Sequence, residues 1–167
     1  MVLRAPDRAA DAPDFGERVF EEQLATLHRA MRDTFSAEAA SQALAEAGRR
    51  AAMELLRPIT PAERARRRDL PRPVAIKQLL NSLHQWAPRF AAGRRFSATG
   101  GEQPVLIIAA NPLCDAPARG TRVCAWHEAL FETLFQALVT PESRVVETAC
   151  LALGDELCRF EVTFDSL

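Results

Sequence analysis

The sequence predicts an α+β domain in which N-terminal helices pack on an antiparallel sheet. Residues 14–95 read as a series of helices, whereas residues 96–167 change to a β-α-β-β order. The composition supports one core, because 167 residues with 48% hydrophobic and 26% charged side chains can fold without disulfides. We therefore expect one compact domain, preceded by a flexible arm over residues 1–13, which lack any apolar period.

Four helices are expected in the N-terminal half, at about residues 14–32, 36–56, 60–70 and 74–86. In the second of them, the small side chains of Ala40, Ala43 and Ala47 would allow another helix to approach closely. The third begins at residues 60–63, where the sequence TPAE combines a capping box with proline at the first helical position. Prolines 58, 71 and 88 mark the breaks between these segments.

The spacing of the apolar residues changes at Phe96, where the series of helices ends and strand patterns begin. A turn is expected at Gly100-Gly101, followed by a buried strand at residues 104–110 and an amphipathic helix at residues 123–138. Two strands of a hairpin, residues 144–153 and 158–164, are expected around a turn at residues 154–156. These elements form the β-α-β-β unit.

Charge is distributed unevenly along a chain whose net charge is −1. Residues 49–95 carry eleven Arg, one Lys and three acidic residues, whereas both flanking segments are acidic. This segment predicts either a solvated helical face or a surface for an anionic ligand or partner. Because the total charge is close to zero, nucleic acid is not an expected partner.

Neither a membrane span nor a secretory leader is expected. The longest apolar run, residues 105–110, is far shorter than the roughly 20 residues that cross a bilayer. The first twenty residues are charged and contain no apolar region of the kind that leaders carry. We expect a cytoplasmic protein.

Three of the four cysteines occur at positions that can converge. Cys124 opens the helix expected at residues 123–138, and Cys150 and Cys158 flank the hairpin turn as cross-strand neighbours. With Glu147 they offer three thiolates and one carboxylate, a set that can complete a tetrahedral zinc shell. Glu147 joins them only if its strand bulges, because a spacing of three residues otherwise places it on the opposite face. The alternative is three ordinary buried thiols beside a solvated Glu147.

Other candidate groups are weaker. Cys114 lies in an expected loop and has no evident partner. A Cys150–Cys158 disulfide would suit a strand pair but not a reducing cytosol. His127 lies on the apolar stripe of its helix and is expected to be a core histidine. No glycine-rich phosphate loop is present, so no nicotinamide or flavin site is recognisable.

Three segments follow one another in the order and spacing of a known family. They are NPL at residues 111–113, CAWH at residues 124–127 and ETACLALGDELCRFE at residues 147–161. Together they resemble the bacteriochlorophyll 4-vinyl reductase family, in whose 4-vinyl reductase domain the pattern E-x-x-C-x-x-x-G-[DH]-x-x-C follows a helix that opens with Cys. The N-terminal half matches more loosely, since Pro88 and Arg89 interrupt an apolar step that family members carry before the first strand.

The resemblance implies a sensor-like α+β fold, shared with phenol-responsive regulators and, more distantly, with vesicle-tethering subunits. In the phenol regulators three Cys and one Glu bind structural zinc, and the matching positions here are Cys124, Glu147, Cys150 and Cys158. The resemblance therefore implies about one Zn²⁺ per chain and a bulge that turns Glu147 inward.

The resemblance also implies a role in tetrapyrrole synthesis. We expect a carrier or chaperone for a Mg-porphyrin or protochlorophyllide-type pigment, acting with magnesium chelatase or with the Mg-protoporphyrin methyltransferase. Two alternatives stay open: an NADPH-dependent 4-vinyl reductase of divinyl-(proto)chlorophyllide, and a small-molecule-sensing zinc domain. A homodimer is compatible with each, as is a position at the surface of the photosynthetic membrane.

A porphyrin is a flat apolar disc with propionate edges, so it suits an aromatic cleft with arginines at its mouth. One stretch of this chain offers aromatic rings, cations and an imidazole able to act as an axial ligand of a bound metal. The candidate pigment-binding residues are His84, Trp86, Phe90, Arg94, Arg95 and Phe96, with Arg89 beside them. Plain core packing is the alternative explanation for the aromatic side chains.

Overall fold

The computed structural model describes residues 15–91, 95–114 and 123–164, so the arm expected at residues 1–13 lies outside the described residues. The helices are α1 (Phe15–Thr34), α2 (Ala37–Leu56), α3 (Pro61–Arg68), α4 (Arg72–Trp86) and α5 (Ala125–Leu138). The strands are β1 (Phe96–Thr99), β2 (Val105–Ile108), β3 (Arg144–Ala149) and β4 (Cys158–Thr163). Short 3₁₀ segments within the described residues include η1 (Ala87–Arg89), η3 (Pro112–Cys114) and η4 (Leu151–Leu153).

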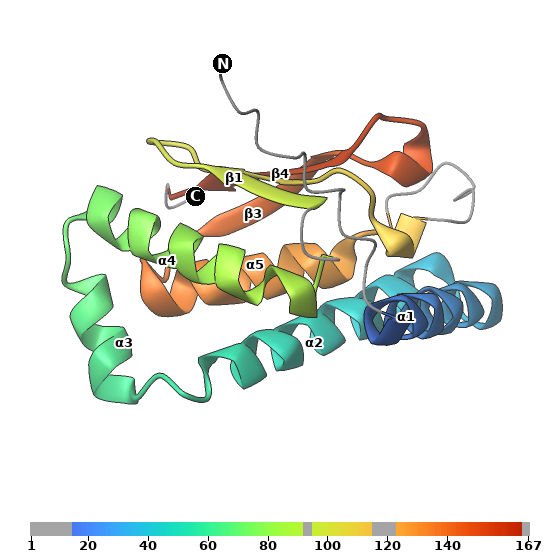
Figure 1. Ribbon diagram of the computed structural model, residues 1–167, viewed down its shortest axis with the longest axis horizontal. Coiled ribbons are helices and arrows are strands. Elements are labelled where there is room, and N and C mark those ends of the chain that lie inside the picture. The colour runs from blue at the N-terminus through green and yellow to red at the C-terminus, as the bar shows by residue number, and fades with distance from the viewer. Residues whose placement is uncertain (1–14, 92–94, 115–122, 165–167) are drawn as a thin grey trace, which may run out of the picture.

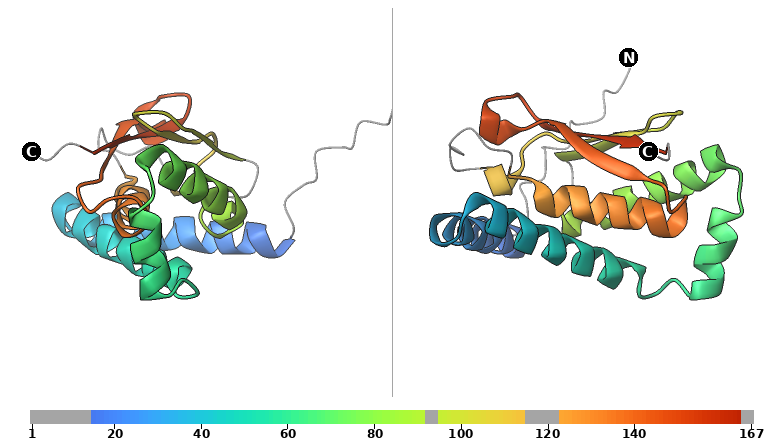
Figure 2. Two further views of the ribbon diagram at one scale, coloured as in Figure 1. Left: turned by 90° about the vertical axis from the view of Figure 1, so that its left-hand side faces the viewer. Right: turned by 180° about the vertical axis from the view of Figure 1, so that it is seen from behind.

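The four strands form one antiparallel sheet in the order β1-β2-β4-β3. Helices α4 and α5 cover one face of this sheet, and α2 packs on the side of α5 that faces away from the strands (Figures 1 and 2). The α+β prediction is therefore confirmed, but the first two helices form a second helical layer and do not lie directly on the sheet. Among the helices that the structure describes, none combines the length and apolar character needed to cross a membrane.

The C-terminal unit differs from the expected β-α-β-β order by one additional strand. Strand β1 pairs with β2 in register from Phe96 opposite Ile108 to Thr99 opposite Val105, which makes the unit β-β-α-β-β. The expected turn at Gly100-Gly101 joins them, and Gly101 has a φ of +129°, which favours glycine. A four-residue edge strand with a single buried side chain, that of Phe96, is too short for an alternating pattern to be recognised in the sequence.

Two helix starts follow the local sequence closely. The Ser36 hydroxyl accepts a hydrogen bond from the Ala39 amide at the start of α2, and the Thr60 hydroxyl accepts one from the Glu63 amide at the start of α3. At the end of α2, the Arg64 guanidinium donates to the Leu56 carbonyl oxygen at 2.7 Å. This contact satisfies a terminal carbonyl and sets the direction of α3.

Helix α2 approaches α5 through a row of small and apolar side chains. The buried positions include Ala40, Leu44, Gly48 and Ala52, which recur every fourth residue and form one face of the helix. Close approach was expected here through Ala40, Ala43 and Ala47. Ala40 is confirmed as buried, whereas Ala43 and Ala47 are exposed. At Gly48 the two backbones come so near that an added Cβ would lie 2.1 Å from the Trp126 carbonyl oxygen.

Replacing Gly48 by Ala should destabilise the protein by at least about 2 kcal/mol, because the new methyl group meets backbone that cannot rotate away. Urea unfolding followed by tryptophan fluorescence measures the loss. Gly100→Ala is the matched control, since a Cβ there meets only Leu80 Cδ1 at an ordinary 3.7 Å. Equal stability of the two variants would show that α2 and α5 are less closely packed than described.

Candidate metal centre

A bulge in β3 places two potential ligands on the same side of the sheet. The register between β3 and β4 shifts between Glu147 and Ala149. Glu147 and Cys150 are both fully buried, with 0% of each exposed, whereas Thr148 between them faces solvent. The expected bulge that turns Glu147 inward is therefore confirmed, and the three-residue spacing is compatible with a shared site.

The turn after Cys150 is held by two features of the matched motif. Gly154 has a φ of +95°, a left-handed conformation that other residues adopt only with strain. The Asp155 carboxylate accepts a hydrogen bond from the Cys150 amide at 2.7 Å. These contacts end β3 at Ala149, so the strand is shorter than the expected 144–153, and they carry the chain back to Cys158 at the start of β4.

Helix α5 fixes the other edge of β3. Glu128 and Glu132, one turn apart, accept hydrogen bonds from the amides of Glu147 at 2.6 Å and Val145 at 3.0 Å. These carboxylates satisfy N–H groups of an edge strand, and they orient β3 relative to the start of α5. Cys124, the residue before α5, thereby lies beside the end of β3.

The structure brings all four cysteines together, including Cys114, for which no partner was expected. The Cys114 sulfur lies 3.5 Å from the sulfur atoms of both Cys124 and Cys158. Cys124 lies 3.6 Å from Cys158 and 4.0 Å from Cys150, sulfur to sulfur. All four sulfur atoms lie within 4.8 Å of one another, and none takes part in a disulfide. Four buried thiols at these distances can hold a metal ion.

A buried amide and a buried imidazole support the thiols. The Asn111 side-chain nitrogen lies 3.2 Å from the Cys124 sulfur and 3.5 Å from that of Cys158, so its N–H groups can donate to thiolates. Burial lowers the pKa of His127 to about 4, which keeps the ring neutral at pH 7. Its Nε2–H then donates to the Phe90 carbonyl oxygen at 2.9 Å, and Nδ1 faces the Asn111 amide at 3.4 Å. His127 is the satisfied core histidine that its position predicted.

Glu147 is the unsatisfied group of this region. Both of its carboxylate oxygens are buried without a nitrogen or oxygen partner, and the groups beside them are the thiols of Cys124 and Cys150. Burial, with a further contribution from the charge of Cys150, raises the pKa of Glu147 to about 9. A buried carboxylate without a partner is costly, so this group requires a proton or a cation beside it.

Hydrogen bonds among the four thiols shift their pKa values in opposite directions. Hydrogen bonds from Cys114 and Cys124 lower the pKa of Cys158 to about 7 and lower that of Cys150 still further. The hydrogen bond with Cys114, together with burial, raises the pKa of Cys124. Thiolates packed this closely repel one another, so full ionisation of the cluster would require a cation among them.

Two members of this site, Cys114 and Asn111, were not identified from the sequence. The pairing of Ile108 with Cys158 was the missing information, because it carries the chain that follows β2 directly over the Cys158 thiol. The NPL segment at residues 111–113 pointed to this loop, but its role depends on the Asn111 side chain. That side chain accepts a hydrogen bond from the Leu113 amide at 3.0 Å and so shapes the turn that carries Cys114.

The expected pigment-binding residues divide into two groups. Phe90 and Phe96 are each 6% exposed and pack edge to face on one another, with ring centroids 5.2 Å apart. They belong to the core together with Phe131. His84 and Arg95 are exposed and Trp86 is half-buried, so these three can be reached from solvent, whereas Arg94 lies outside the described residues. The His84 ring stands edge-on to Phe96 at 5.3 Å.

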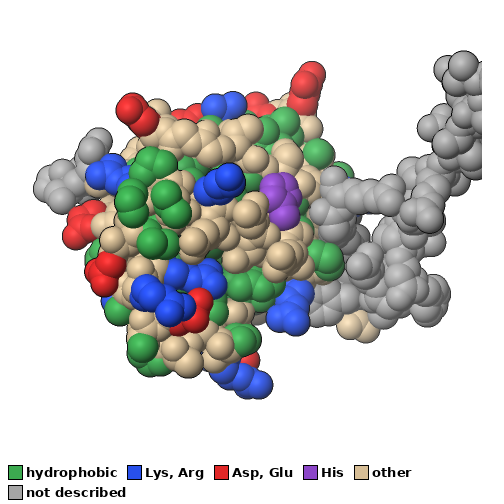
Figure 3. Space-filling view, turned by 60° about the vertical axis from the view of Figure 1, so that its left-hand side comes forward, with side chains coloured by type: hydrophobic (Ala, Val, Ile, Leu, Met, Phe, Trp, Pro, Cys, Tyr) green, Lys and Arg blue, Asp and Glu red, His purple; other side chains and the backbone are tan. Residues whose placement is uncertain are grey.

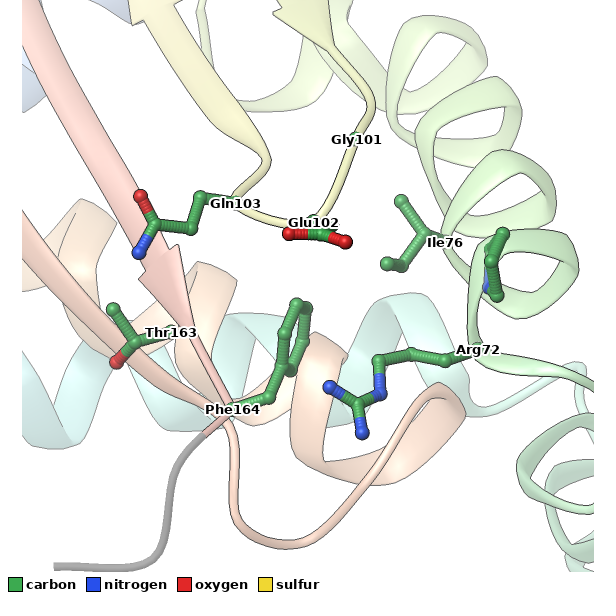
Figure 4. A pocket seen from close by; sticks show the side chains of 8 residues that line it. Arg72, Ile76, Gly101, Glu102, Gln103, Thr163 and Phe164 are labelled. Carbon is green, nitrogen blue, oxygen red and sulfur yellow. The ribbon is translucent and has the colours of Figure 1, made fainter.

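A groove of about 790 Å³ lies at the opposite end of α4. It is bordered by the first turn of α4, the β1–β2 turn and the end of β4, as the labelled side chains in Figure 4 show. The Arg72 guanidinium lies 5.3 Å from the centre of the Phe164 ring, and Ile76 adds an apolar wall. Glu102 supplies negative charge at the turn. No feature of the sequence analysis pointed to this groove.

Some arginines of the basic segment, residues 49–95, form ion pairs within the fold. Arg66 and Arg67 of α3 both pair with Glu63 at 3.2 Å. Arg68 and Arg72 are exposed. Figure 3, which brings forward the side carrying α3, shows basic side chains among apolar ones on this face. Some arginines therefore pair locally and others present positive charge to solvent, as on a solvated helical face. The surface for an anionic ligand or partner stays a prediction.

Comparisons with known proteins find a matching domain family and relatives of similar sequence. The V4R domain family matches residues 104–164. A relative from Cereibacter sphaeroides, named "Bacteriochlorophyll synthase 23 kDa chain", is 38% identical over 145 residues, covering 85% of this chain and 69% of the relative. A protein of the same name from Rhodobacter capsulatus is 31% identical over 161 residues, covering 95% and 74%.

Two solved structures share the fold at 14% identity. One is a trafficking protein particle complex subunit 3 from Naegleria fowleri covalently bound to palmitic acid, with a TM-score of 0.59 over 89% of this chain and 97% of that one. The other is the phenol-responsive sensory domain of the transcription activator PoxR with phenol, with a TM-score of 0.58 over 85% and 73%. At this identity the likeness shows the fold alone, and it agrees with both fold relatives that the sequence implied.

Proposed function

Because this chain belongs to the V4R-domain proteins of bacteriochlorophyll biosynthesis, we propose that it is an accessory chain that binds a tetrapyrrole intermediate and presents it to a biosynthetic enzyme. The intermediate is a Mg-porphyrin or a protochlorophyllide-type pigment. The observation that carries the proposal is the shared identity, over most of the chain, with two relatives named as chains of bacteriochlorophyll synthase. A chain of a larger enzyme can act by delivering substrate without carrying out chemistry itself.

The exposed basic side chains support a docking role. Arg68 and Arg72 lie where α3 leads into α4, next to the arginines that pair with Glu63. Such a surface attracts an acidic partner and accelerates its association. Magnesium chelatase and the Mg-protoporphyrin methyltransferase, which handle successive Mg-porphyrins, are the partners we propose.

The first candidate surface for the pigment is the C-terminal end of α4. His84 is exposed there and can serve as an axial ligand of the pigment's magnesium, with Trp86 at the end of the same helix and Arg95 on a neighbouring segment. Phe90 and Phe96 lie beneath this surface and would line the site only if the core opened. The second candidate is the groove at the other end of α4, where Arg72 can meet a propionate and Phe164 a ring face.

Trp86→Ala should weaken pigment binding at least about tenfold without unfolding the chain, because the ring contributes stacking area while remaining half-buried. Absorbance titration with Mg-protoporphyrin and with divinyl protochlorophyllide measures the dissociation constant. Arg72→Ala is the matched variant at the opposite end of the helix and should leave binding unchanged. If Arg72→Ala weakens binding and Trp86→Ala does not, the pigment binds in the groove. If the unmodified protein shows no saturable spectral shift, the carrier proposal is overturned.

The same titration with NADPH separates the carrier from the reductase alternative. A carrier leaves the divinyl spectrum unchanged after NADPH is added. Conversion of that spectrum by the protein and NADPH alone would identify a 4-vinyl reductase. Saturable binding of phenols in place of pigments would instead favour the small-molecule-sensing alternative, which the shared fold of the phenol-responsive domain keeps open.

The metal that we propose for the thiol cluster is Zn²⁺, in a structural role. Thiolates select soft or borderline cations, and zinc is the common structural ion among them. The four sulfur atoms come from segments far apart in the chain, the loop after β2, the start of α5 and the β3–β4 hairpin. An ion joining them would stabilise the folded arrangement of those segments.

Purified protein should therefore contain about one zinc per chain by elemental analysis. Removing the metal with a strong chelator should lower the thermal midpoint by about 10 °C, because several kcal/mol of binding energy stabilise the folded state. Adding Zn²⁺ should restore the midpoint, whereas Mg²⁺ should not. Metal-free protein with an unchanged midpoint would contradict the zinc proposal.

A further inference from the structure

We propose that Cys114 is the fourth ligand of the metal centre, so that four thiolates hold the ion and Glu147 lies beside it without coordinating it. This inference rests on the proposed zinc centre. It departs from the set of three cysteines and one glutamate that the sequence resemblance implies. Two observations favour Cys114, the distances among the sulfur atoms and the turn that positions its backbone. The four thiols then match the four ligands that a structural zinc site accepts.

The sulfur atoms already have the spacing of a tetrahedral site. With Zn–S bonds of about 2.3 Å, the sulfur atoms of a tetrahedral shell lie about 3.8 Å apart. Cys114 is 3.5 Å from Cys124 and 3.5 Å from Cys158, and Cys124 and Cys158 are 3.6 Å apart. Cys114 therefore completes a triangular face of such a shell. Cys150 lies 4.0 Å from Cys124 and within 4.8 Å of the other two sulfur atoms, so it can supply the remaining vertex.

The backbone that leads to Cys114 is held by the Asn111 turn and by a contact with α1. The Cys114 amide donates to the Asn111 carbonyl oxygen at 3.0 Å, within the turn that the Asn111 side chain also closes. Arg32 of α1 reaches the Leu113 carbonyl oxygen at 3.5 Å, and Leu113 itself is buried. Cys114 is thus presented to the cluster by an ordered segment, in the way that ligands of structural sites are.

Glu147 is the competing ligand. Its unpartnered oxygens would also be explained by a shell of three thiolates and one carboxylate. However, within the described residues the group of mutually close donor atoms consists of the four sulfur atoms and does not include this carboxylate. Structural zinc sites are closed at four ligands, and four thiolates already exceed the ion's charge by two. A fifth anionic donor would meet a filled and negatively charged shell.

Sulfur coordination can be counted directly in the full-length protein. We expect zinc X-ray absorption of the unmodified protein to fit four sulfur ligands at about 2.3 Å with no oxygen ligand. In the cobalt-substituted protein, Cys114→Ser should reduce the thiolate-to-metal charge-transfer absorption by about one quarter, since one of four sulfur ligands is lost. It should also weaken metal affinity at least about tenfold, because even changes around such ligands cost that much. Glu147→Gln should leave the cobalt spectrum unchanged.

Cys124→Ser is the positive control, because Cys124 is a ligand in either arrangement. Circular dichroism of each variant confirms folding, and Cys114→Ala replaces Cys114→Ser if the latter does not fold. A cobalt spectrum that changes in Glu147→Gln but not in Cys114→Ser would overturn this inference and leave the zinc centre standing. Failure of the unmodified protein to bind zinc or cobalt would overturn both, so the two failures are distinguishable.

Discussion

The position of helix α5 is the constraint on which the other elements depend. On one side, Gly48 lets the α2 backbone come within contact of the Trp126 carbonyl, a distance that no side chain would permit. On the other side, Glu128 and Glu132 accept hydrogen bonds from the amides of β3. The helix is thereby held between the second helical layer and the sheet, and the residue before it, Cys124, is placed at the centre of the thiol cluster.

Two further segments, the β3–β4 hairpin and the chain after β2, bring the other cysteines to Cys124. The β3 bulge and the left-handed Gly154 bring the hairpin to one side of Cys124. The pairing of β2 with β4 brings Cys114 to another side, since the chain leaves β2 beside Cys158. Each of these contacts is local, yet their result is four thiols that would repel one another if all were ionised. A cation resolves that repulsion, so the same contacts that shape the fold also define a metal-binding site.

The sequence predicted most elements for reasons that operate within a few residues. Capping at Thr60, the alternation of β4 and the turn residues Gly101 and Gly154 all act locally, and each was recognisable. Strand β1 was not, because four residues are too few for an alternating pattern. Cys114 was not assigned either, since its partners are ten and forty-four residues away along the chain. The bulge at Glu147 was expected only through the family resemblance, because a register shift leaves no pattern of its own.

The aromatic residues show a different limit of sequence reasoning. A ring that lines a ligand site and a ring that fills a core have the same sequence pattern, and Phe90 and Phe96 fill the core. The two candidate pigment surfaces lie at opposite ends of α4, one with His84 and Trp86 and the other with Arg72. Helix α4 contacts the sheet through β1, an edge strand, whereas the thiol cluster includes residues of the β3–β4 hairpin and the start of α5. A ligand beside α4 therefore need not disturb the metal centre, and a metal that stabilises one end of the sheet leaves the helix free to serve for binding.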